Sequence, residues 1–405
     1  MSQDIKVCLL VNIIPPYYLP VFEHLRDLLG GLQVFVSTPM EPNRDWRTEW
    51  GGLAVTVQNC WTYTTNWRHE QGFSDKIWRH IPYDTLPILI RQRPDVVISM
   101  QLGFRTLQAA LYRKLFPRSR LIVWTGLSEH TEKGLPFWRI LQRRALLHLA
   151  DAVLINGASG TEYLVGLGVP RNEIFLQLYC AEIAPHLSLC LRREQNVARR
   201  LLYVGQLTVR KGLGPFLRVL CKWLSNHPTA SCEFWIAGDG PLRPELEKFL
   251  APSQLRLRFT GSVTYEKLPE LYAQAGIFVF PTLADEWGVV VNEALASGLP
   301  VLGSTYSQAV EELIKDGFNG WTFRPDNTDE MYSALDKAMT VQDQQLEEMR
   351  RAGRERIRAL TPRYGANCFM AAIDFVLQTR KTGSSRNKWI PNKSEGTENV
   401  EASQS

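Results

Sequence analysis

The chain has 405 residues, of which 45% are hydrophobic and 21% are charged, with a formal net charge of +5. These proportions exclude a fibrous or wholly disordered protein, and the length favours two domains over a single core. The charge is the small difference between 46 basic and 41 acidic residues, so it does not indicate a nucleic-acid partner.

The cysteines and the N-terminus indicate a cytoplasmic protein. The seven cysteines are scattered and show no spacing typical of metal ligands, so we expect neither a disulfide framework nor a zinc site. The apolar run at 7–14 lacks the features of a signal peptide, and no segment approaches the ~20 apolar residues that cross a membrane. We interpret that run as the first strand.

Short apolar segments alternate with helical patterns through the first half of the chain. This order is typical of a parallel sheet covered by helices on both faces. Strands are predicted at 5–11, 32–37, 94–100, 120–126 and 151–157, and helices at 20–30, 106–116 and 137–150. Residues 40–80 interrupt the pattern and predict an inserted loop or irregular hairpin near the mouth of the first domain.

A second series of strands begins at residue 200 and predicts a second domain of the same kind. Its strands are expected at 200–205, 232–240, 255–261, 276–282, 299–304 and 320–325. The predicted fold class is therefore α/β, with two Rossmann-like, doubly wound domains at 1–190 and 191–360. A last helix at 361–378 is free to return to the first domain, and the polar composition of 379–405 predicts disorder.

Ligands of such sheets bind at the carboxyl ends of the strands, so the loops that follow the second-domain strands are the candidate site. Three of these loops contain glycines, which allow a ligand to approach the backbone. In the first, Arg210 and Lys211 carry positive charge suited to phosphate. A helix beginning near Gly288 and Val289 would direct its free N–H groups toward the same place. The candidate glycines are Gly205, Gly238, Gly240 and Gly288.

The stretch LADEWGVVVNEALASGLPVLGS, residues 283–304, adds two acids to this site. Asp285 precedes the glycine, and Glu293 lies in an apolar helical run, where a carboxylate is costly unless a partner satisfies it. Structural explanations stay open for each feature. The Gly-Asp-Gly sequence is also typical of an ordinary turn. Arg210 and Lys211 are also compatible with a solvated helix start, and Glu293 with a buried acid that is hydrogen-bonded within the protein and binds no ligand.

Together these residues resemble the retaining glycosyltransferases of family 4. The family pattern has an acid, seven residues and then a glutamate, followed by small residues, glycine and proline. Here it is filled by Asp285, Trp287, Gly288, Glu293, Ala294, Gly298 and Pro300. The resemblance is strongest from about residue 200 to 340. It implies the GT-B fold, in which two Rossmann-like domains face each other across a cleft.

The resemblance also implies roles for single residues. Glu293 is expected to bind ribose hydroxyls, Lys211 the donor diphosphate, and Asp285 the donor sugar, with Glu286 as a substitute for Asp285. Gln206 stands where the family usually has an arginine, and Arg210 is a candidate to replace that charge. Trp287 and Val289 belong to the same predicted donor site. His130, just after a first-domain strand, is expected near the reacting sugar, although a plain surface histidine remains an alternative.

The expected function is the transfer of a hexosyl unit, with retention, from a nucleoside diphosphate sugar to an acceptor hydroxyl. The expected acceptor is a saccharide or a lipid-linked saccharide of polysaccharide or glycolipid assembly. No metal and no cofactor are expected. Two alternatives remain: a catalytically weak nucleotide-sugar binder, and an interaction protein that uses the cationic, apolar helices at 105–120 and 138–149 on a membrane surface. The expected location is the cytoplasm, with peripheral contact at the inner face of the membrane as a further option.

Overall fold

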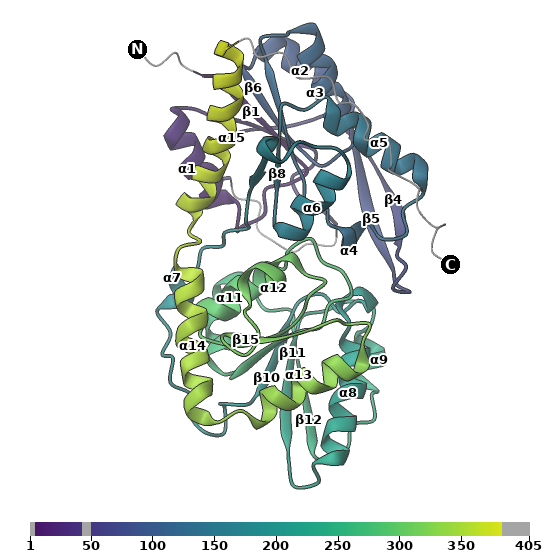
Figure 1. Cartoon of the computed structure of the whole chain (residues 1–405), viewed down its shortest axis with the longest axis vertical. Helices are drawn as coiled ribbons and strands as arrows, with labels where there is room; N and C mark the ends of the chain where they lie inside the picture. Colours follow the sequence, from purple (N-terminus) through teal and green to yellow (C-terminus); the bar gives the residue numbers. More distant parts are fainter. Residues whose placement is uncertain (1–4, 43–49, 383–405) are drawn as a thin grey trace, which may run out of the picture.

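The computed structural model describes residues 5–42 and 50–382 of the chain. Two α/β domains lie one above the other along the long axis of the molecule (Figure 1). The first sheet has the strand order β3-β2-β1-β6-β7-β8-β9, and the second has the order β12-β11-β10-β13-β14-β15. Every strand pair in both sheets is parallel. The predicted fold class is confirmed.

The first domain takes its strands from the apolar segments of the first half of the chain. They are β1 Val7–Val11, β2 Gln33–Val36, β3 Ala54–Val57, β6 Val96–Met100, β7 Arg120–Trp124, β8 Ala152–Ile155 and β9 Ile174–Leu176. The helices are α1 Leu19–Leu29, α2 Thr85–Gln92, α3 Phe104–Leu115, α4 Glu129–Glu132, α5 Phe137–His148 and α6 Ala158–Gly166. Every residue of the interior strand β1 is buried, as expected of a strand covered on both faces.

The second domain repeats this arrangement around a smaller sheet. Its strands are β10 Leu201–Val204, β11 Cys232–Ala237, β12 Leu255–Gly261, β13 Ile277–Phe280, β14 Val301–Ser304 and β15 Gly320–Phe323. Its helices are α8 Leu213–Asn226, α9 Arg243–Glu247, α10 Leu268–Ala273, α11 Val289–Ala296, α12 Gln308–Leu313, α13 Thr328–Thr340 and α14 Asp343–Arg358. The short helix α7 Ala184–Leu187 lies in the segment that leads from β9 to β10.

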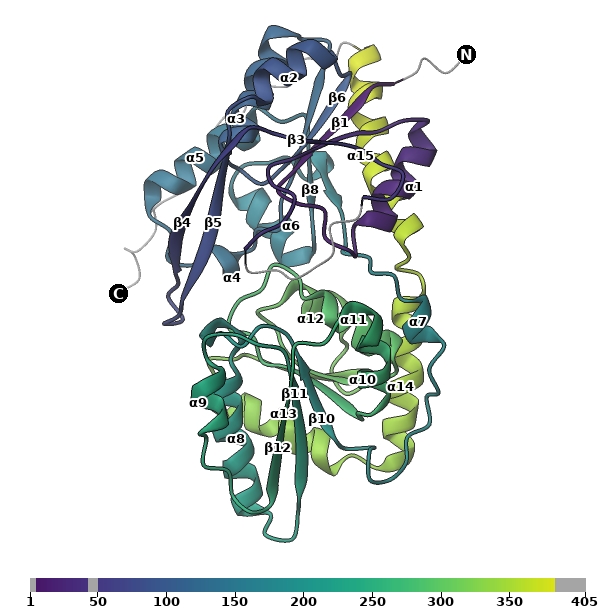
Figure 2. The same ribbon diagram turned by 180° about the vertical axis from the view of Figure 1, so that it is seen from behind.

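Residues 40–80 differ from the expected irregular insertion. Residues 54–57 form the edge strand β3, and the next segment is a regular antiparallel hairpin of β4 Cys60–Arg68 and β5 Ser74–Pro82. The sequence pattern did not show this because every residue of β4 is exposed or half-buried, so no buried apolar alternation marks the strand. Residues 43–49 lie outside the described part of the chain. The tip of the hairpin points toward the second domain (Figure 2).

The last helix returns to the first domain. Helix α15, Pro362–Thr382, packs against α1, and the side chain of Arg120 donates to the carbonyl of Val376 over 3.3 Å. The helix extends four residues beyond the expected end at 378. The rest of the expected disordered tail, 383–405, lies outside the described residues.

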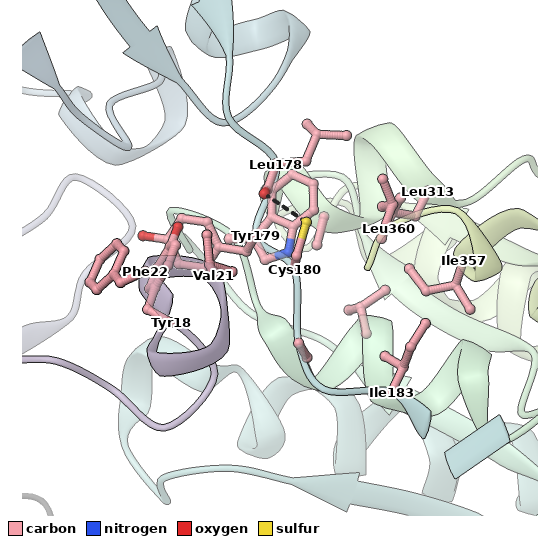
Figure 3. Packing of buried hydrophobic residues seen from close by; sticks show 14 of the residues in the cluster. Tyr18, Val21, Phe22, Leu178, Tyr179, Cys180, Ile183, Leu313, Ile357 and Leu360 are labelled. Atoms are coloured by element: carbon pink, nitrogen blue, oxygen red, sulfur yellow. Dashed lines mark hydrogen bonds between the residues drawn. The ribbon is translucent and has the colours of Figure 1, made fainter. Parts of the chain in front are cut away.

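A continuous apolar cluster joins the domains on the side of the connecting segments. Figure 3 shows Leu178, Tyr179 and Cys180 of the segment after β9 packed between α1 and the second domain. Ile357 and Leu360, at the end of α14, belong to the same cluster. The domains therefore share a core, and they are not connected by a linker alone.

Phe369→Ala tests the return of α15 to the first domain. Phe369 is fully buried, and its ring centroid lies 5.1 Å from that of Trp124 and 6.2 Å from that of Phe22. We expect the cavity to lower the free energy of unfolding by about 3–5 kcal/mol, measured by urea unfolding. The matched control, Gln378→Ala, changes an exposed residue of the same helix and should stay within about 0.5 kcal/mol of wild type. Equal losses in both variants would contradict this packing.

Candidate functional site

The loops after β10 and β11 interlock at the carboxyl end of the second sheet. The N–H of Leu207 donates to the carbonyl of Asp239 over 2.9 Å. A Cβ added at Gly238, where φ is +129°, would lie 1.9 Å from the carbonyl oxygen of Gly205, and one at Gly240 would lie 2.5 Å from that of Leu207. Both glycines are therefore required by the packing of the two loops, whether or not a ligand binds there.

Four charged side chains meet where the second domain faces the hairpin. Lys211 forms an ion pair with Asp285, and Arg210 contacts Asp285 at 3.5 Å and Asp75 of β5 at 2.8 Å. All four side chains are between 13% and 16% exposed. We call Asp75, Arg210, Lys211 and Asp285 the ion cluster. It joins the first domain to the loop that follows β10.

The ion cluster is held in place by a tight turn. Residues Val209–Lys211 form one turn of 3₁₀ helix, and Gly212 follows with φ of +71°. A Cβ at Gly212 would lie 1.9 Å from the carbonyl oxygen of Pro281, so only glycine lets this turn lie against the end of β13. That contact brings Arg210 and Lys211 beside Asp285.

Electrostatics keep the ion cluster charged. Burial alone would raise the pKa of Asp285, but Lys211 and Arg210 lower it below the ordinary value of an aspartate. Burial would likewise lower the pKa of Arg210, and Asp285 and Asp75 outweigh that effect and raise it. Two cations face two anions, so the cluster is neutral overall. An incoming phosphate must therefore replace a carboxylate at Lys211 or Arg210.

Glu293 lies in α11 and is only 1% exposed. The hydroxyl of Tyr272 donates to its carboxyl group over 3.0 Å. Burial raises the pKa of Glu293 to about 7. Burial and then the charge of Glu293 raise the pKa of Tyr265, whose hydroxyl has no hydrogen-bond partner among the described residues. Glu293 is thus a buried acid with one neutral side-chain donor, and it retains the capacity to accept further hydrogen bonds.

Trp287 supports the site from inside the core. It is 1% exposed, and its indole N–H donates to the side chain of Asn292 over 2.9 Å. Asn292 in turn donates to the carbonyl of Tyr179, in the segment between the domains, over 2.7 Å. Gly288 has φ of +105°, and Val289 begins α11 directly after it. The ring of Trp287 therefore fixes the start of α11 and does not face a ligand.

Glu286 and Asp285 are neighbours in sequence but face different parts of the molecule. The carboxylate of Asp285 contacts the loop after β10, whereas Glu286 is exposed into a cavity of about 140 Å³ on the first-domain side. The surrounding protein and the charge of Asp285 raise the pKa of Glu286. The cavity is lined by Val11, Asn12, Ile13, Pro15, Tyr17, Tyr18, Phe22, Glu41, Met100, Gln101, Trp124, Tyr179 and Glu286.

A larger hollow, of about 410 Å³, lies beside Arg26 and Gly52 at the outer edge of the first sheet. It contains none of the predicted site residues, whereas the smaller cavity contains Glu286. The candidate site therefore comprises the smaller cavity, with Glu286, and the ion cluster. Among residues 5–42 and 50–382, no three His, Cys, Asp or Glu side chains come together as a metal-binding group.

His130 reaches the second domain. Its ring stacks on Tyr306, with centroids 4.2 Å apart and planes 19° from parallel. The backbone carbonyl of Tyr306 accepts from the N–H of Asp285 over 3.0 Å, so His130 lies next to the segment that carries the acids. Burial lowers the pKa of His130, which favours the neutral ring at neutral pH.

Sequence reasoning missed the residues that join the domains at this site. Asp75 is 135 positions from Arg210 and lies in the stretch without a clear pattern. Nothing in the sequence distinguishes Tyr306 or Tyr272 from the other aromatic residues. Gln206, which the sequence did predict, lies half-buried in the loop after β10, where its backbone carbonyl accepts from the hydroxyl of Tyr203 over 2.8 Å. No sequence signal identifies the Asp75 contact, because pairing across domains leaves no local pattern.

The second domain is similar in sequence to known glycosyltransferases. Residues 198–340 match the model of the glycosyl transferases group 1 family. Alpha-D-kanosaminyltransferase from Streptomyces kanamyceticus is 31% identical over 141 residues, which are 34% of this chain and 36% of that protein. Sulfoquinovosyl transferase SQD2 from Arabidopsis thaliana is 27% identical over 272 residues, which are 61% of this chain and 50% of that protein. The matched segment thus spans between a third and half of these relatives.

Solved structures resemble the whole chain. The lipopolysaccharide outer core galactosyltransferase WaaB has a TM-score of 0.67 at 14% identity, over 92% of this chain and 99% of that one. HepE from Anabaena in complex with UDP-glucose has a TM-score of 0.63 at 14% identity, over 93% and 99%. At these identities the likeness concerns the fold, which is the GT-B fold. The second domain matches the glycosyl transferases group 1 family, so the resemblance predicted from its motif is confirmed.

Glu293→Gln separates a ligand-binding acid from a structural one. Because burial raises the pKa of Glu293 from 4.5 to about 7, the folded protein binds this proton more tightly than the unfolded chain. This carboxyl therefore makes the free energy of unfolding fall as pH rises between those two values. The variant should lose that decline, so at a pH above the raised pKa its melting temperature without ligand should equal or exceed that of wild type.

The same variant should lose about 1–3 kcal/mol of affinity for a nucleoside diphosphate, because a charged acceptor becomes neutral. Calorimetric titration measures this affinity. Glu270→Gln, an exposed acid in α10, is the control and should change neither property. A lower melting temperature of the ligand-free variant, with unchanged nucleotide affinity, would make Glu293 a purely structural carboxyl.

Proposed function

We propose that the protein is a retaining glycosyltransferase that moves a hexosyl unit from a nucleoside diphosphate sugar to an acceptor hydroxyl. The observation that carries this proposal is the juxtaposition of Lys211, Arg210 and Asp285 at the carboxyl end of the second sheet, inside a group 1 domain. HepE, which shares the fold, has been solved with UDP-glucose bound, and this supports a nucleotide-sugar donor.

On the donor side, Glu293 would accept hydrogen bonds from the ribose hydroxyls. Lys211 would turn from Asp285 to the diphosphate, where it gains a charge-assisted hydrogen bond. Asp285, released from Lys211, would accept from a hydroxyl of the donor sugar. The backbone of Gly205, Gln206 and the start of α11 at Val289 would lie along the diphosphate. One ion pair of the ligand-free protein is thereby exchanged for two contacts with the donor.

In the reaction, the bond between the anomeric carbon and the diphosphate oxygen breaks, and a bond from the acceptor oxygen forms on the same face of the sugar. The proton of the acceptor hydroxyl passes to the leaving phosphate. Negative charge therefore grows on the diphosphate in the transition state, where preplaced cations stabilise it. Lys211 and Arg210 supply this charge from the chain itself, so the proposed reaction is independent of metal.

The acceptor side of the proposal is the cavity of about 140 Å³ in front of Glu286. Its polar wall includes Asn12, whose side-chain oxygen accepts from the buried guanidinium of Arg105 over 2.9 Å, and Gln101, which accepts from the amide of Asn12 over 3.3 Å. Fixed amide and carboxyl groups of this kind suit the hydroxyls of a sugar. His130 would then lie at the border between acceptor and donor.

The proposed acceptor is a saccharide or a lipid-linked saccharide, and the proposed location is the cytoplasm at the inner face of the membrane. One relative, from Campylobacter jejuni, carries a PP-undecaprenol glycan in its name, and it is 28% identical over 48% of this chain. Within the described residues, no helix is long and apolar enough to cross a membrane. Contact with lipid is therefore proposed to occur at the surface.

A catalytically weak nucleotide-sugar binder is the second candidate. Gln206 carries no charge, and Arg210 already binds Asp75, so less positive charge is free for the diphosphate than an arginine at position 206 would supply. A thermal-shift screen of nucleoside diphosphate sugars identifies the donor, because a ligand of the folded state raises its melting temperature. Turnover of that donor with a saccharide acceptor supports the transferase, and binding without turnover supports the second candidate.

Lys211→Ala tests the diphosphate contact. The loss of a charge-assisted hydrogen bond in the transition state, about 1.5–3 kcal/mol, should lower kcat/KM for the donor by about one to two orders of magnitude. Initial rates of nucleoside diphosphate release measure the effect. Lys337→Ala, whose side chain is 60% exposed on α13, is the matched control. A folded Lys211 variant with wild-type kcat/KM would refute the assignment.

Asp285→Asn tests the separate roles of the two acids. Removal of this carboxylate takes one anionic partner from both Lys211 and Arg210, while Arg210 keeps its ion pair with Asp75. Affinity for the free nucleoside diphosphate should therefore stay equal or rise, while sugar transfer should fall by at least about tenfold. Titration calorimetry and transfer assays on one preparation measure both quantities. The neighbouring variant Glu286→Gln should leave binding of the free diphosphate unchanged. If diphosphate binding is lost in Asp285→Asn, Asp285 does not have the proposed role.

A further inference from the structure

Helix α3 has a second apolar face that no part of the described protein covers. Phe104, Leu107, Leu111 and Leu115 are between 44% and 55% exposed. Their spacing of three or four residues places them in one stripe along the helix. The opposite face of α3 is already packed, since Ala109 is fully buried in the core. Packing on the sheet therefore does not explain the exposed stripe.

Helix α5 continues this surface. Its first turn exposes Phe137 by 71% and Trp138 by 59%, and Leu141 follows with 48%. Helices α3 and α5 are in contact, and both views show them on the same side of the first domain as the β4–β5 hairpin (Figures 1 and 2). The exposed apolar residues of α3 and α5 thus lie on two helices in contact, and together we call them the α3–α5 surface. Patches of large apolar side chains on a soluble domain commonly mark a binding site.

The charges of the two helices have one sign. The sequences of α3, FRTLQAALYRKL, and α5, FWRILQRRALLH, contain six Arg or Lys residues and no acid. Arg113 and Arg143 are paired with Asp151 and Glu132 from other elements. Lys114 and Arg144 are exposed beside the apolar residues. The α3–α5 surface therefore combines apolar side chains with positive charge, and no carboxylate of residues 5–42 or 50–382 forms an ion pair with Lys114 or Arg144.

We propose that the α3–α5 surface docks on a membrane that carries anionic lipids. Helices with Phe, Trp and Leu on one side and bases at the border are suited to lie in the plane of the lipid interface. The bases would meet the negative headgroups there. A second copy of the chain fits less well. A symmetric contact would bring Lys114 and Arg144 of both copies together without an acid on either helix.

The position of the surface relates it to the proposed reaction. Only residues 133–136 separate α5 from α4, which carries His130 at the contact with the second domain. Docking through α5 would hold this side of the molecule close to the lipid, from which a lipid-linked acceptor would reach the site. The role of docking in acceptor access rests on the proposed function. Docking itself does not, because membrane binding can be measured without any transfer reaction.

The test is flotation of the full chain with vesicles. We expect the wild-type protein to float with phosphatidylcholine vesicles that contain phosphatidylglycerol, and to float much less with phosphatidylcholine alone or at high salt. The double variant Leu111→Ser/Trp138→Ser should reduce the partition coefficient by at least about tenfold. Lys114→Glu/Arg144→Glu should reduce binding to the anionic vesicles in particular.

Matched controls come from the second domain. Leu250 and Phe318 are exposed by 95% and 56%, so Leu250→Ser/Phe318→Ser removes a similar amount of apolar surface and should float as wild type does. All variants should have the wild-type melting temperature, and the donor identified by the thermal-shift screen should raise it by the same amount as in wild type. A loss of flotation with donor binding intact would then reflect docking alone and not the proposed function.

Two results would overturn the proposal. The first is a wild-type protein that does not float with anionic vesicles, or that floats equally well when the α3–α5 residues are changed. The second is a wild-type dimer in analytical ultracentrifugation that becomes monomeric in Leu111→Ser/Trp138→Ser without any flotation, since this surface would then bind a second copy.

Discussion

The site depends on the ion cluster between Asp285 and two adjacent bases. Lys211 and Arg210 come from one tight turn, and Arg210 also binds Asp75 in the hairpin of the other domain. Charged groups that are mostly removed from water need partners with good geometry. These contacts therefore fix the turn, the loop before α11 and the tip of the hairpin relative to one another. Any anionic ligand has to enter this network by exchange.

The two domains are joined by contacts of two different kinds. On one side, Tyr179 and Trp287 stack with their ring centroids 5.9 Å apart in a continuous apolar core. On the other side, the joint is the polar contact of Asp75 with Arg210, beside Phe73, which packs on Leu283. An apolar core loses its contacts when it opens, whereas a base in the ion cluster can exchange one anionic partner for another and stay paired. The geometry thus favours ligand-dependent change at the hairpin over change at the connecting segments.

Adjacent residues in the acidic loop serve opposite sides of the site. Asp285 faces the bases after β10, and Glu286 faces the first-domain cavity. Their environments also shift the two pKa values in opposite directions, because bases surround Asp285 whereas desolvation by the surrounding protein and a neighbouring carboxylate act on Glu286. The loop can therefore present one charged acid and one more readily protonated acid within two residues. The exposed α3–α5 surface lies on the domain that supplies most of the cavity.

The sequence by itself determined the two parallel α/β domains, because buried strands such as Val7–Val11 are continuous apolar runs. It also indicated the family that the second domain matches, since the spacing of Asp285 and Glu293 and the glycines around them are local features of one loop and one helix. Tertiary structure decided what these residues contact. That Arg210 binds Asp75, that Trp287 points into the core and that residues 60–82 form a hairpin depend on packing between distant segments. Such contacts leave no periodic pattern in the chain, because their energy comes from partners brought together only by folding.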